Sequence, residues 1–337
     1  MQNQPLVSII TPGYNCGAVV HRLLDSILAQ TWQNIEFIFV NDGSTDNTAE
    51  VLDSYREKFA ARGISMILIY QENQGQAVAL GNGLQHFTGD YLCWCDSDDY
   101  LEVDAMESRV IILERNPEYT VVVGQTNNID SKSMTITHVR SPHKVAAQPN
   151  KLFMSILQDS NQAYYCCGAY MVRSTDFLFK NPSKYIYPSR TGQNIQMLLP
   201  CLYNCGVYVI NKPVYNYVIY SNSHSHADRS KEQKLDRYQD MHTIRVETLN
   251  HMNIPAELRN EYVKLSMIAM YKSQYSIAVQ YQDKELAGKL KRILKNEGAY
   301  SFRDAKNYWE IVDPVFRLLL RIYRKLYSIL RKILRKK

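Results

Sequence analysis

The chain has 337 residues, of which 45% are hydrophobic and 21% charged, so it can bury one large domain core and a smaller appendage. Its formal net charge is +6, but residues 313–337 hold nine Lys or Arg and one Asp, a net +8, which leaves −2 for the rest of the chain. The body of the protein therefore lacks the basic character of a nucleic-acid-binding domain, and we expect no nucleic-acid partner.

The first hundred residues alternate between predicted strands and helices. Runs rich in β-branched and aromatic residues predict strands at Leu6–Thr11, Ile35–Val40, Ile64–Tyr70 and Tyr91–Cys95. Helical periodicity or capping residues predict helices at Val20–Leu28, after Ser44–Asp46, at Gln76–Phe87 and from Asp104 to Glu114. This alternation favours a parallel sheet flanked by helices, which is an α/β fold.

The rest of the chain is less regular. Residues 127–148 are polar and read as a loop or short strands, residues 151–158 as a helix, and residues 164–172 as a buried strand or helix. From Asp228 to Lys295 the sequence is helix-forming, with few Gly or Pro. We therefore expect a catalytic domain at 1–225, a helical domain at 226–312 and a separate terminal helix at 313–337.

Cysteine usage and the absence of long apolar runs bear on location. The seven Cys lie mostly in apolar runs, which favours buried thiols in a reducing compartment. Cys201 and Cys205 have no second Cys/His pair at a usual zinc spacing. No uncharged run reaches the roughly 18–20 residues that span a bilayer, and no signal peptide precedes the first strand. We expect a cytoplasmic protein.

Two acidic clusters follow predicted strands. VNDGSTDNT occupies Val40–Thr48 and CWCDSDDYL occupies Cys93–Leu101. In an open α/β sheet, ligands bind outside the carboxyl ends of the strands, so we expect both clusters at one edge. Carboxylates gathered there repel one another unless a cation joins them, and Mg²⁺ or Mn²⁺ favours such oxygen ligands and bridges to substrate phosphates. The clusters therefore indicate a metal–nucleotide site.

These clusters belong to a longer series of motifs. The first block comprises VSIITPGYN (Val7–Asn15), QTWQNIEFIFVNDGSTD (Gln30–Asp46), ENQG (Glu72–Gly75) and GDYLCWCDSDD (Gly89–Asp99). The second block comprises GAYMVR (Gly168–Arg173), GQNIQMLLP (Gly192–Pro200) and YNYVIYSNSHS (Tyr215–Ser225). In order and spacing they resemble family 2 glycosyltransferases over roughly the first two-thirds of the chain. The resemblance implies the GT-A fold, a mostly parallel central sheet flanked by helices, and a nucleotide-diphospho-sugar donor.

The resemblance also implies roles for particular residues. Asp42 corresponds to the carboxylate that contacts the nucleotide base. The other residues expected to bind the nucleotide-sugar are Pro12, Tyr14, Asn15, Gly75, Asp96 and Ser97. Asp96, Asp98 and Asp99 resemble the D-x-D signature, with Asp98 the main ligand of Mn²⁺ or Mg²⁺, Asp96 on the ribose or a metal-bound water, and Asp99 assisting. One of the three, which the sequence does not single out, is alternatively only structural and caps the turn into the helix near Asp104. His224 and His226 are further candidates for the metal shell.

Two positions depart from the family pattern. Where the family usually carries a Glu-Asp pair that supplies the catalytic base, this chain has Gln193 and Asn194, and an amide has no basic site for a hydroxyl proton. Asp159 or His143 supplies the base, or Asn194 only positions the acceptor, or activity is lost. A basic residue of the third motif is replaced by Leu80, which leaves Arg173 or Arg190 for phosphate contact.

The terminal segment has a pattern of its own. From Val315 to Lys337, basic residues recur at helical spacing beside an apolar stripe, which predicts a helix of roughly 34 Å. A helix that is basic on one face and apolar on the other is typical of attachment to an anionic membrane surface, where each Lys or Arg contributes on the order of 1 kcal/mol. A helix packed on its own domain, with a solvated basic face, is the main alternative, and a nucleic-acid-binding tail or a coiled coil with a partner are the others.

Together these features predict an inverting, metal-dependent glycosyltransferase. We expect it to use a UDP-sugar and a lipid-linked or polysaccharide acceptor in bacterial cell-surface glycan synthesis, on the inner face of the cell membrane. The alternative is a non-catalytic nucleotide-sugar-binding or scaffold subunit. A dinucleotide-binding oxidoreductase is disfavoured, because TPGYNCG (Thr11–Gly17) lacks the G-x-G-x-x-G pattern after the first strand.

Overall fold

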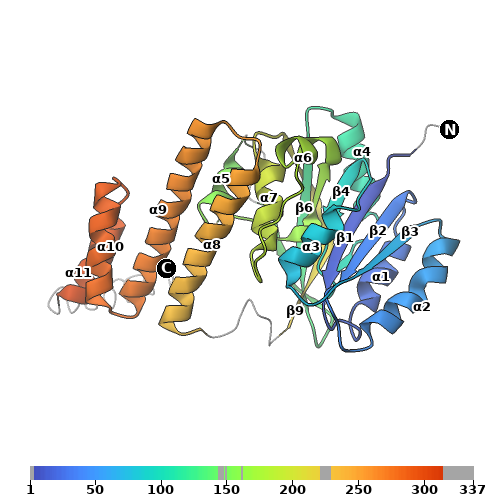
Figure 1. The fold of residues 1–337 in the computed structure, drawn as a ribbon, viewed down its shortest axis with the longest axis horizontal. Coiled ribbons are helices and arrows are strands. Elements are labelled where there is room, and N and C mark those ends of the chain that lie inside the picture. Colours follow the sequence, from blue (N-terminus) through green and yellow to red (C-terminus); the bar gives the residue numbers. More distant parts are fainter. Residues whose placement is uncertain (1–3, 143–147, 149, 161, 221–228, 314–337) are drawn as a thin grey trace, which may run out of the picture. The chain divides into compact units, whose positions relative to one another are not determined.

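The computed structural model describes residues 4–142, 148, 150–160, 162–220 and 229–313. The chain divides into two compact units (Figure 1). The first comprises Met1–Ala227 and Thr243–Val263, and the second comprises Asp228–His242 and Lys264–Lys337. The expected boundary between residues 225 and 226 and the expected terminal helix beyond residue 313 lie outside the described residues, so the predicted three-part division stays a prediction.

The first unit is built on a single sheet. Its described strands are β1 (Val7–Gly13), β2 (Ile35–Asn41), β3 (Ser65–Tyr70), β4 (Tyr91–Trp94), β5 (Tyr100–Leu101), β6 (Val121–Asp130), β7 (Ile136–Arg140), β8 (Tyr170–Arg173) and β9 (Val207–Ile219). They are arranged in the order β3-β2-β1-β4-β8-β6-β9-β5, with β7 paired to β6. Strands β3, β2, β1 and β4 are mutually parallel, whereas β8 is antiparallel to both β4 and β6.

Helices connect and cover these strands (Figure 1). They are α1 (His21–Leu28), α2 (Thr48–Ala61), α3 (Gln76–Leu84), α4 (Ala105–Arg115), α5 (Lys151–Leu157), α6 (Ser174–Lys180) and α7 (Gln193–Leu202), with a short 3₁₀ turn at Cys167–Ala169. The chain steps from β1 to β2 to β3 and then returns across β1 to β4. With right-handed crossovers, α1 and α2 therefore cover one face of the sheet and α3 the other.

The strand β6 is longer than the sequence pattern indicated, because its polar half is buried. Thr126 and Asn127 are fully or almost fully buried. The Asn127 amide donates to Glu102 (3.1 Å) and to Asn216 on β9 (3.0 Å), and Thr126 accepts a hydrogen bond from Tyr164 (2.8 Å). Such internal partners let a polar stretch occupy a central strand, so residues 127–130 and 136–140 form strands in a region expected to be a loop or short strands.

The second unit is helical, as expected from the composition after Asp228. It contains the beginning of α8 (Lys231–His251), the end of α9 (Ala256–Gln280), and α10 (Lys284–Asn296) and α11 (Phe302–Val312). Its small core is formed by Tyr275, Ala278, Ala287, Leu290 and Leu294. Asp283 caps α10 by accepting from the Leu286 amide, and Ser301 and Asp304 form a capping box on α11.

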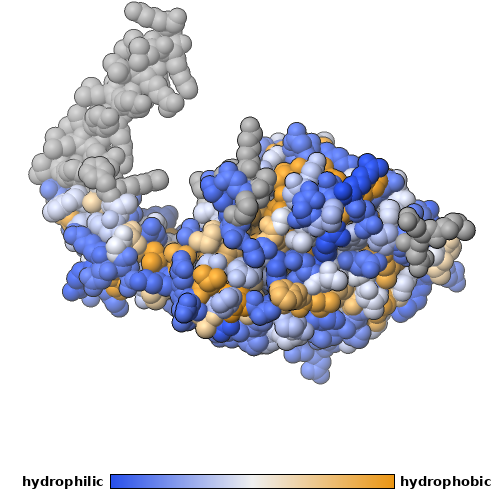
Figure 2. Space-filling model, turned by 90° about the horizontal axis from the view of Figure 1, so that it is seen from above, coloured by the Kyte–Doolittle hydropathy of each residue, from blue (hydrophilic) through white to orange (hydrophobic). Residues whose placement is uncertain are grey.

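The exposed surface is mixed in polarity. Figure 2 shows hydrophobic residues interspersed with hydrophilic ones on the visible face. Over the part of the chain that the structure describes, no helix combines the length and the apolar character needed to cross a bilayer.

Candidate active site

The strand order brings the two acidic clusters to one edge of the sheet. The central strand β1 lies between β2 and β4, in parallel register with both: Gly13 pairs with Asn41, and Ile10 pairs with Trp94. The residues that follow these strands therefore leave the sheet at the same edge, where the strand order reverses. This is the position at which open α/β sheets bind ligands. Both acidic clusters therefore lie at one edge of the sheet, as the sequence predicted.

Asp42, which directly follows β2, is buried and held by the loop of residues 71–75, here called the amide loop. Its Oδ1 accepts from the Gln71 side chain (2.7 Å) and the Gln74 backbone N–H (2.9 Å), and its Oδ2 accepts from the Gly75 backbone N–H (2.9 Å). Gly75 has a φ of +94°, which favours glycine. The ENQG motif thus serves to enclose the Asp42 carboxylate.

The loop after β1 is joined to the loop after β2 by Asn15. This residue has a φ of +48°. Its Oδ1 accepts from the Thr45 N–H (2.8 Å), and its own N–H donates to Ser44 Oγ (2.9 Å). Tyr14 is 50% exposed beside it, whereas Pro12 is buried in β1. Asn15 therefore fixes the shape of this edge, and Tyr14 offers a ring to a ligand.

Asp96, which follows β4 by two residues, accepts a hydrogen bond on each of its carboxylate oxygens. Its Oδ1 accepts from Gln76 Nε2 (2.7 Å) and its Oδ2 from the Cys167 thiol (3.3 Å). Burial, and secondarily the charge of Asp98, raise the pKa of Asp96 to about 6. Both effects disfavour the anionic form of Asp96, whereas a bound cation would favour it.

Ser97 and Asp98 occupy the middle of a turn that runs from Asp96 to Asp99, here called the D-x-D turn. Both are partly exposed. Burial raises the pKa of the Asp98 carboxyl, and the Arg22 charge partly opposes that shift. Arg22 donates to the backbone carbonyl of Asp98 (3.1 Å) and to the Tyr220 hydroxyl, so it supports the turn while leaving the Asp98 carboxylate available to a ligand.

Asp99 differs from the other two carboxylates of the turn. It is fully buried, and it accepts hydrogen bonds from the Tyr215 hydroxyl and from the Val218 backbone N–H (2.8 Å). Burial raises the pKa of Asp99 well above its usual value. Both of its oxygens therefore face β9, and the geometry favours Asp99, which was expected to assist the metal, as the structural member of the three carboxylates.

The remaining carboxylates suit a divalent ion that is shared with a substrate. No group of three or more His, Cys, Asp or Glu suited to a metal is present in the described part of the chain. Mg²⁺ is typically held by one or two carboxylates together with substrate phosphates and waters, and Asp96 and Asp98, whose pKa values are both raised, fit that donor set. His224 and His226 lie outside the described residues.

At the expected base position, the Asn194 side chain is fixed by Trp94. The indole Nε1–H of Trp94 donates to Asn194 Oδ1 (3.1 Å). Because an indole N–H can only donate, the carbonyl oxygen of Asn194 faces Trp94 and its NH₂ group is left as a donor. Gln193 is the first residue of α7, and neither amide can act as a base.

The two other base candidates gain no support. His143 lies outside the described residues. The Asp159 carboxylate accepts from the Tyr165 hydroxyl (2.9 Å) and forms an ion pair with the buried Arg245 (3.5 Å). The Oδ1 atom of Asp159 is therefore already engaged by both of these partners.

The two arginine candidates for phosphate contact lie in different places. Arg173 donates to the carbonyls of Tyr119 and Leu113 and to the Tyr91 hydroxyl, at the opposite end of β4 from Asp96, so the expectation for Arg173 was wrong. Arg190 is exposed, and its Cα lies 3.4 Å from where a Cβ of Gly75 would be. Arg190 is therefore next to the amide loop.

Several residues of the site were not identified from the sequence. The Gln71 side chain donates a hydrogen bond to Asp42, and the Gln76 side chain donates one to Asp96. Cys167 and Tyr215 also contact Asp96. Cys167 and Tyr215 adjoin or begin quoted motifs, so motif membership was the available signal. Leu80, at the usual basic position, is fully buried.

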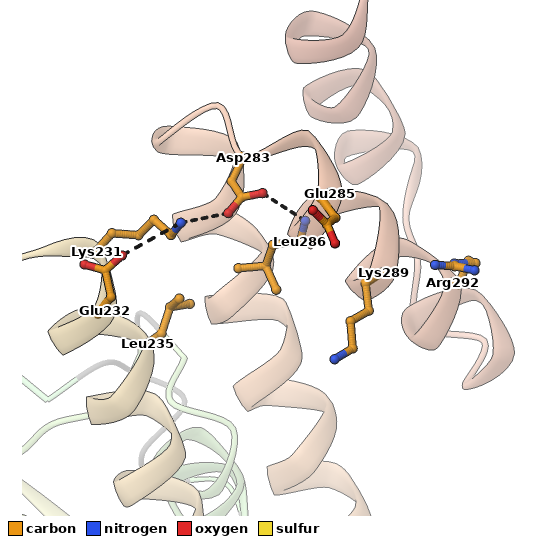
Figure 3. Close-up of a pocket in the computed structure, with 8 residues that line it drawn as sticks. All are labelled: Lys231, Glu232, Leu235, Asp283, Glu285, Leu286, Lys289 and Arg292. Carbon is orange, nitrogen blue, oxygen red and sulfur yellow. Dashed lines mark hydrogen bonds and ion pairs between the residues drawn. The ribbon is translucent and has the colours of Figure 1, made fainter.

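A pocket of about 430 Å³ in the second unit has a different character (Figure 3). It is lined by Lys231, Glu232, Leu235, Asp283, Glu285, Leu286, Lys289 and Arg292. Asp283 is engaged there by Lys231 (2.8 Å) and by the backbone N–H of Leu286 in α10 (2.9 Å). The mixture of opposite charges, partly neutralised within the pocket, does not define a ligand.

The chain has the fold of GT-A glycosyltransferases. A solved structure of residues 1–349 of S. aureus TarS in complex with UDP-GlcNAc is similar with a TM-score of 0.60 and 16% identity, over 91% of this chain and 90% of that one. The mannosyltransferase PcManGT from Pyrobaculum calidifontis, in complex with GDP-Man and Mn²⁺, gives a TM-score of 0.53 and 14% identity, over 96% and 89%. At these identities the likeness concerns the fold.

Sequence similarity then identifies the family. The model of Glycosyl transferase family 2 matches residues 8–179, more than half of the chain, and the chain belongs to this family, as its motifs indicated. The uncharacterized glycosyltransferase RT0329 of Rickettsia typhi is 36% identical over 146 residues, 43% of each protein. Glycosyltransferase GlyA of Streptococcus pneumoniae is 38% identical over 102 residues, 30% of this chain and 14% of the relative. The chain spans less than half the length of the curated relatives it matches.

Proposed function

We propose that the protein is an inverting, metal-dependent glycosyltransferase that moves a sugar from a UDP-sugar to a lipid-linked or polysaccharide acceptor in bacterial cell-surface glycan synthesis. The proposal rests on the position of Asp42 and of the Asp96–Asp98 pair at the same edge of the sheet. The first carboxylate is suited to a nucleotide base, and the pair is suited to a cation on the diphosphate. Solved proteins of this fold are in complex with UDP-GlcNAc, UDP and GDP-Man.

The hydrogen bonds of Asp42 favour uracil over guanine. A carboxylate offers about four acceptor sites, and the amide loop uses two on Oδ1 and one on Oδ2. The remaining site can accept one N–H, which is what the N3–H of uracil supplies. Guanine presents two donors, N1–H and the N2 amino group, to a carboxylate, and would have to displace a loop hydrogen bond.

The metal would act on the leaving group. Asp98 and Asp96 would hold Mn²⁺ or Mg²⁺, which stabilises negative charge on the departing nucleoside diphosphate. Arg190, which lies beside the amide loop, is the residue proposed to add a positive charge to the diphosphate. These residues thus bind and orient the donor, while the residue that receives the acceptor proton stays unassigned.

The acceptor and the location are inferred from the terminal segment. Residues 315–337 carry the basic, apolar-striped pattern that suits an anionic membrane surface, and a membrane-bound acceptor would explain such a segment on the cytoplasmic side. Deleting residues 315–337 should abolish co-sedimentation with anionic vesicles without lowering the melting temperature. Unchanged vesicle binding by the truncated protein would contradict this part of the proposal.

A panel of UDP- and GDP-sugars with Mn²⁺ and a membrane lipid extract tests the donor and the metal. We expect Mn²⁺-dependent release of UDP from one donor, lost in Asp98→Ala and retained in Asp53→Ala, which removes an exposed carboxylate on α2. Turnover of GDP-sugars alone would contradict the uracil assignment. Turnover that persists both in EDTA and in Asp98→Ala would contradict the proposed dependence on a metal ion.

A second candidate function is a non-catalytic nucleotide-sugar-binding or scaffold subunit. The fixed amide of Asn194 at the usual base position favours it. It predicts Mn²⁺-dependent binding of UDP, measured by calorimetry, without sugar transfer or hydrolysis from any donor of the panel. Turnover of any donor excludes it.

A further inference from the structure

The hydroxyl group of Tyr215 contacts both ends of the D-x-D turn, at Asp96 and at Asp99. Tyr215 on β9 is fully buried. Its O–H donates to the Asp99 carboxylate, and its oxygen accepts from the Asp96 backbone N–H (3.3 Å). The Cys167 sulfur lies 3.5 Å from the same oxygen and donates to Asp96 Oδ2. The start of the turn, its end and one side-chain oxygen of Asp96 are therefore linked through Tyr215.

The position of this hydroxyl is fixed by close packing of the ring. A Cβ on Gly168 would lie 2.1 and 2.2 Å from Cε2 and Cδ2 of Tyr215, so the ring occupies the space that any other residue at 168 would need. Protein interiors are packed closely enough that such a ring has no alternative place. A ring that is held in place by packing also holds its hydroxyl group at a fixed position beside the D-x-D turn.

We propose that Tyr215 is a positioning residue for the metal–diphosphate site. By holding Asp96 N–H and Asp99 together, it sets the turn so that the carboxylates of Asp96 and Asp98 converge on one cation. It touches neither substrate nor metal, and it acts through the turn. The inference rests on the proposed function, since it requires that Asp96 and Asp98 bind a divalent ion with the nucleotide.

The proposal separates two parts of donor binding. The base contact of Asp42 depends on the amide loop, and none of the described hydrogen bonds of Asp42 involves β9. The metal contact depends on the turn that Tyr215 supports. Loss of the Tyr215 hydroxyl should therefore weaken the Mn²⁺-dependent part of UDP binding and leave the metal-independent part intact.

Tyr215→Phe removes the hydroxyl and keeps the ring against Gly168. UDP affinity is measured by calorimetry in Mn²⁺ and in EDTA for the parent, for Tyr215→Phe, and for Tyr208→Phe, which alters an exposed hydroxyl on the same strand. We expect the gain in affinity from Mn²⁺ to fall by about tenfold in Tyr215→Phe only. The electron paramagnetic resonance spectrum of Mn²⁺–UDP on the protein should change in the same variant.

The remaining outcomes are distinguishable. An unchanged Mn²⁺ gain in Tyr215→Phe overturns the positioning role, and so does an equal loss of affinity in Mn²⁺ and in EDTA, which would mean general destabilisation. If Tyr215→Phe does not fold, Asp99→Asn, which weakens the same hydrogen bond from the other side, is measured with the same readout and the same expectation. A parent protein that binds UDP in neither condition refutes the proposed function itself.

Discussion

Replacing Asp42 by Asn tests whether this carboxylate both organises the amide loop and binds the base. The carboxylate accepts three hydrogen bonds from the loop across its two oxygens, whereas an Asn side chain has one oxygen and an NH₂ group that only donates. At least one loop N–H is then left facing a donor. An unsatisfied buried donor costs about 1–3 kcal/mol, and we expect the free energy of unfolding in urea to fall by that amount.

The same change should also reduce the affinity for the nucleotide. A hydrogen bond to a charged group contributes about 1.5–3 kcal/mol, so UDP should bind about 10- to 160-fold more weakly. Glu72→Gln removes one negative charge from an exposed position of the amide loop and should leave both quantities nearly unchanged. If Asp42→Asn lowers stability but binds UDP within about twofold of the parent, the carboxylate serves the loop alone and the base assignment is refuted.

Three further changes test the packing, the charge and the phosphate contact of the site. Gly168→Ala forces a methyl group into the Tyr215 ring and should lower the free energy of unfolding by about 1–3 kcal/mol, whereas Gly288→Ala, where a Cβ meets no atom closer than 3.8 Å, should not lower it. Because the pKa of Asp96 is raised to about 6, its protonated form adds stability at low pH that is lost as pH rises through about 6. Without metal, the parent should therefore lose about 2 kcal/mol more than Asp96→Asn between pH 4 and pH 7, and equal pH profiles in urea denaturation would contradict the raised pKa of Asp96. Arg190→Ala should weaken binding of UDP but not of uridine in calorimetry, and an equal loss for both ligands would place Arg190 away from the diphosphate.

The first half of the fold was predictable because its elements depend on local patterns. The apolar runs at Ile35–Val40 and Tyr91–Cys95 are buried parallel strands, and parallel register places their carboxyl ends at one edge whatever the details. Residues 127–130 were less predictable. Asn127 is a strand residue only because Glu102 and Asn216 accept its hydrogen bonds, and such partners, 25 and 89 positions away, leave no local signature.

The candidate site shows the same division between local and distant causes. Asp42 and Asp96 could be identified because they directly follow strands in short motifs. Tyr215 lies 119 positions after Asp96, and only the antiparallel return of the chain through β8 and the length of β9 bring them together. The error for Arg173 has the same origin, since β8 runs opposite to β4 and carries that residue to the other end of the strand.

The amide at position 194 is consistent with the local structure without being required by it. A carboxylate there could accept the same Trp94 N–H through one oxygen and keep the other as a base, so Trp94 would accommodate either residue. With Asn, the group left over is a donor, which can stabilise negative charge on an oxygen but cannot remove a proton from it. If the enzyme is active, the acceptor must therefore lose its proton to a group other than residue 194, and Asn194 can contribute only by holding an oxygen in place.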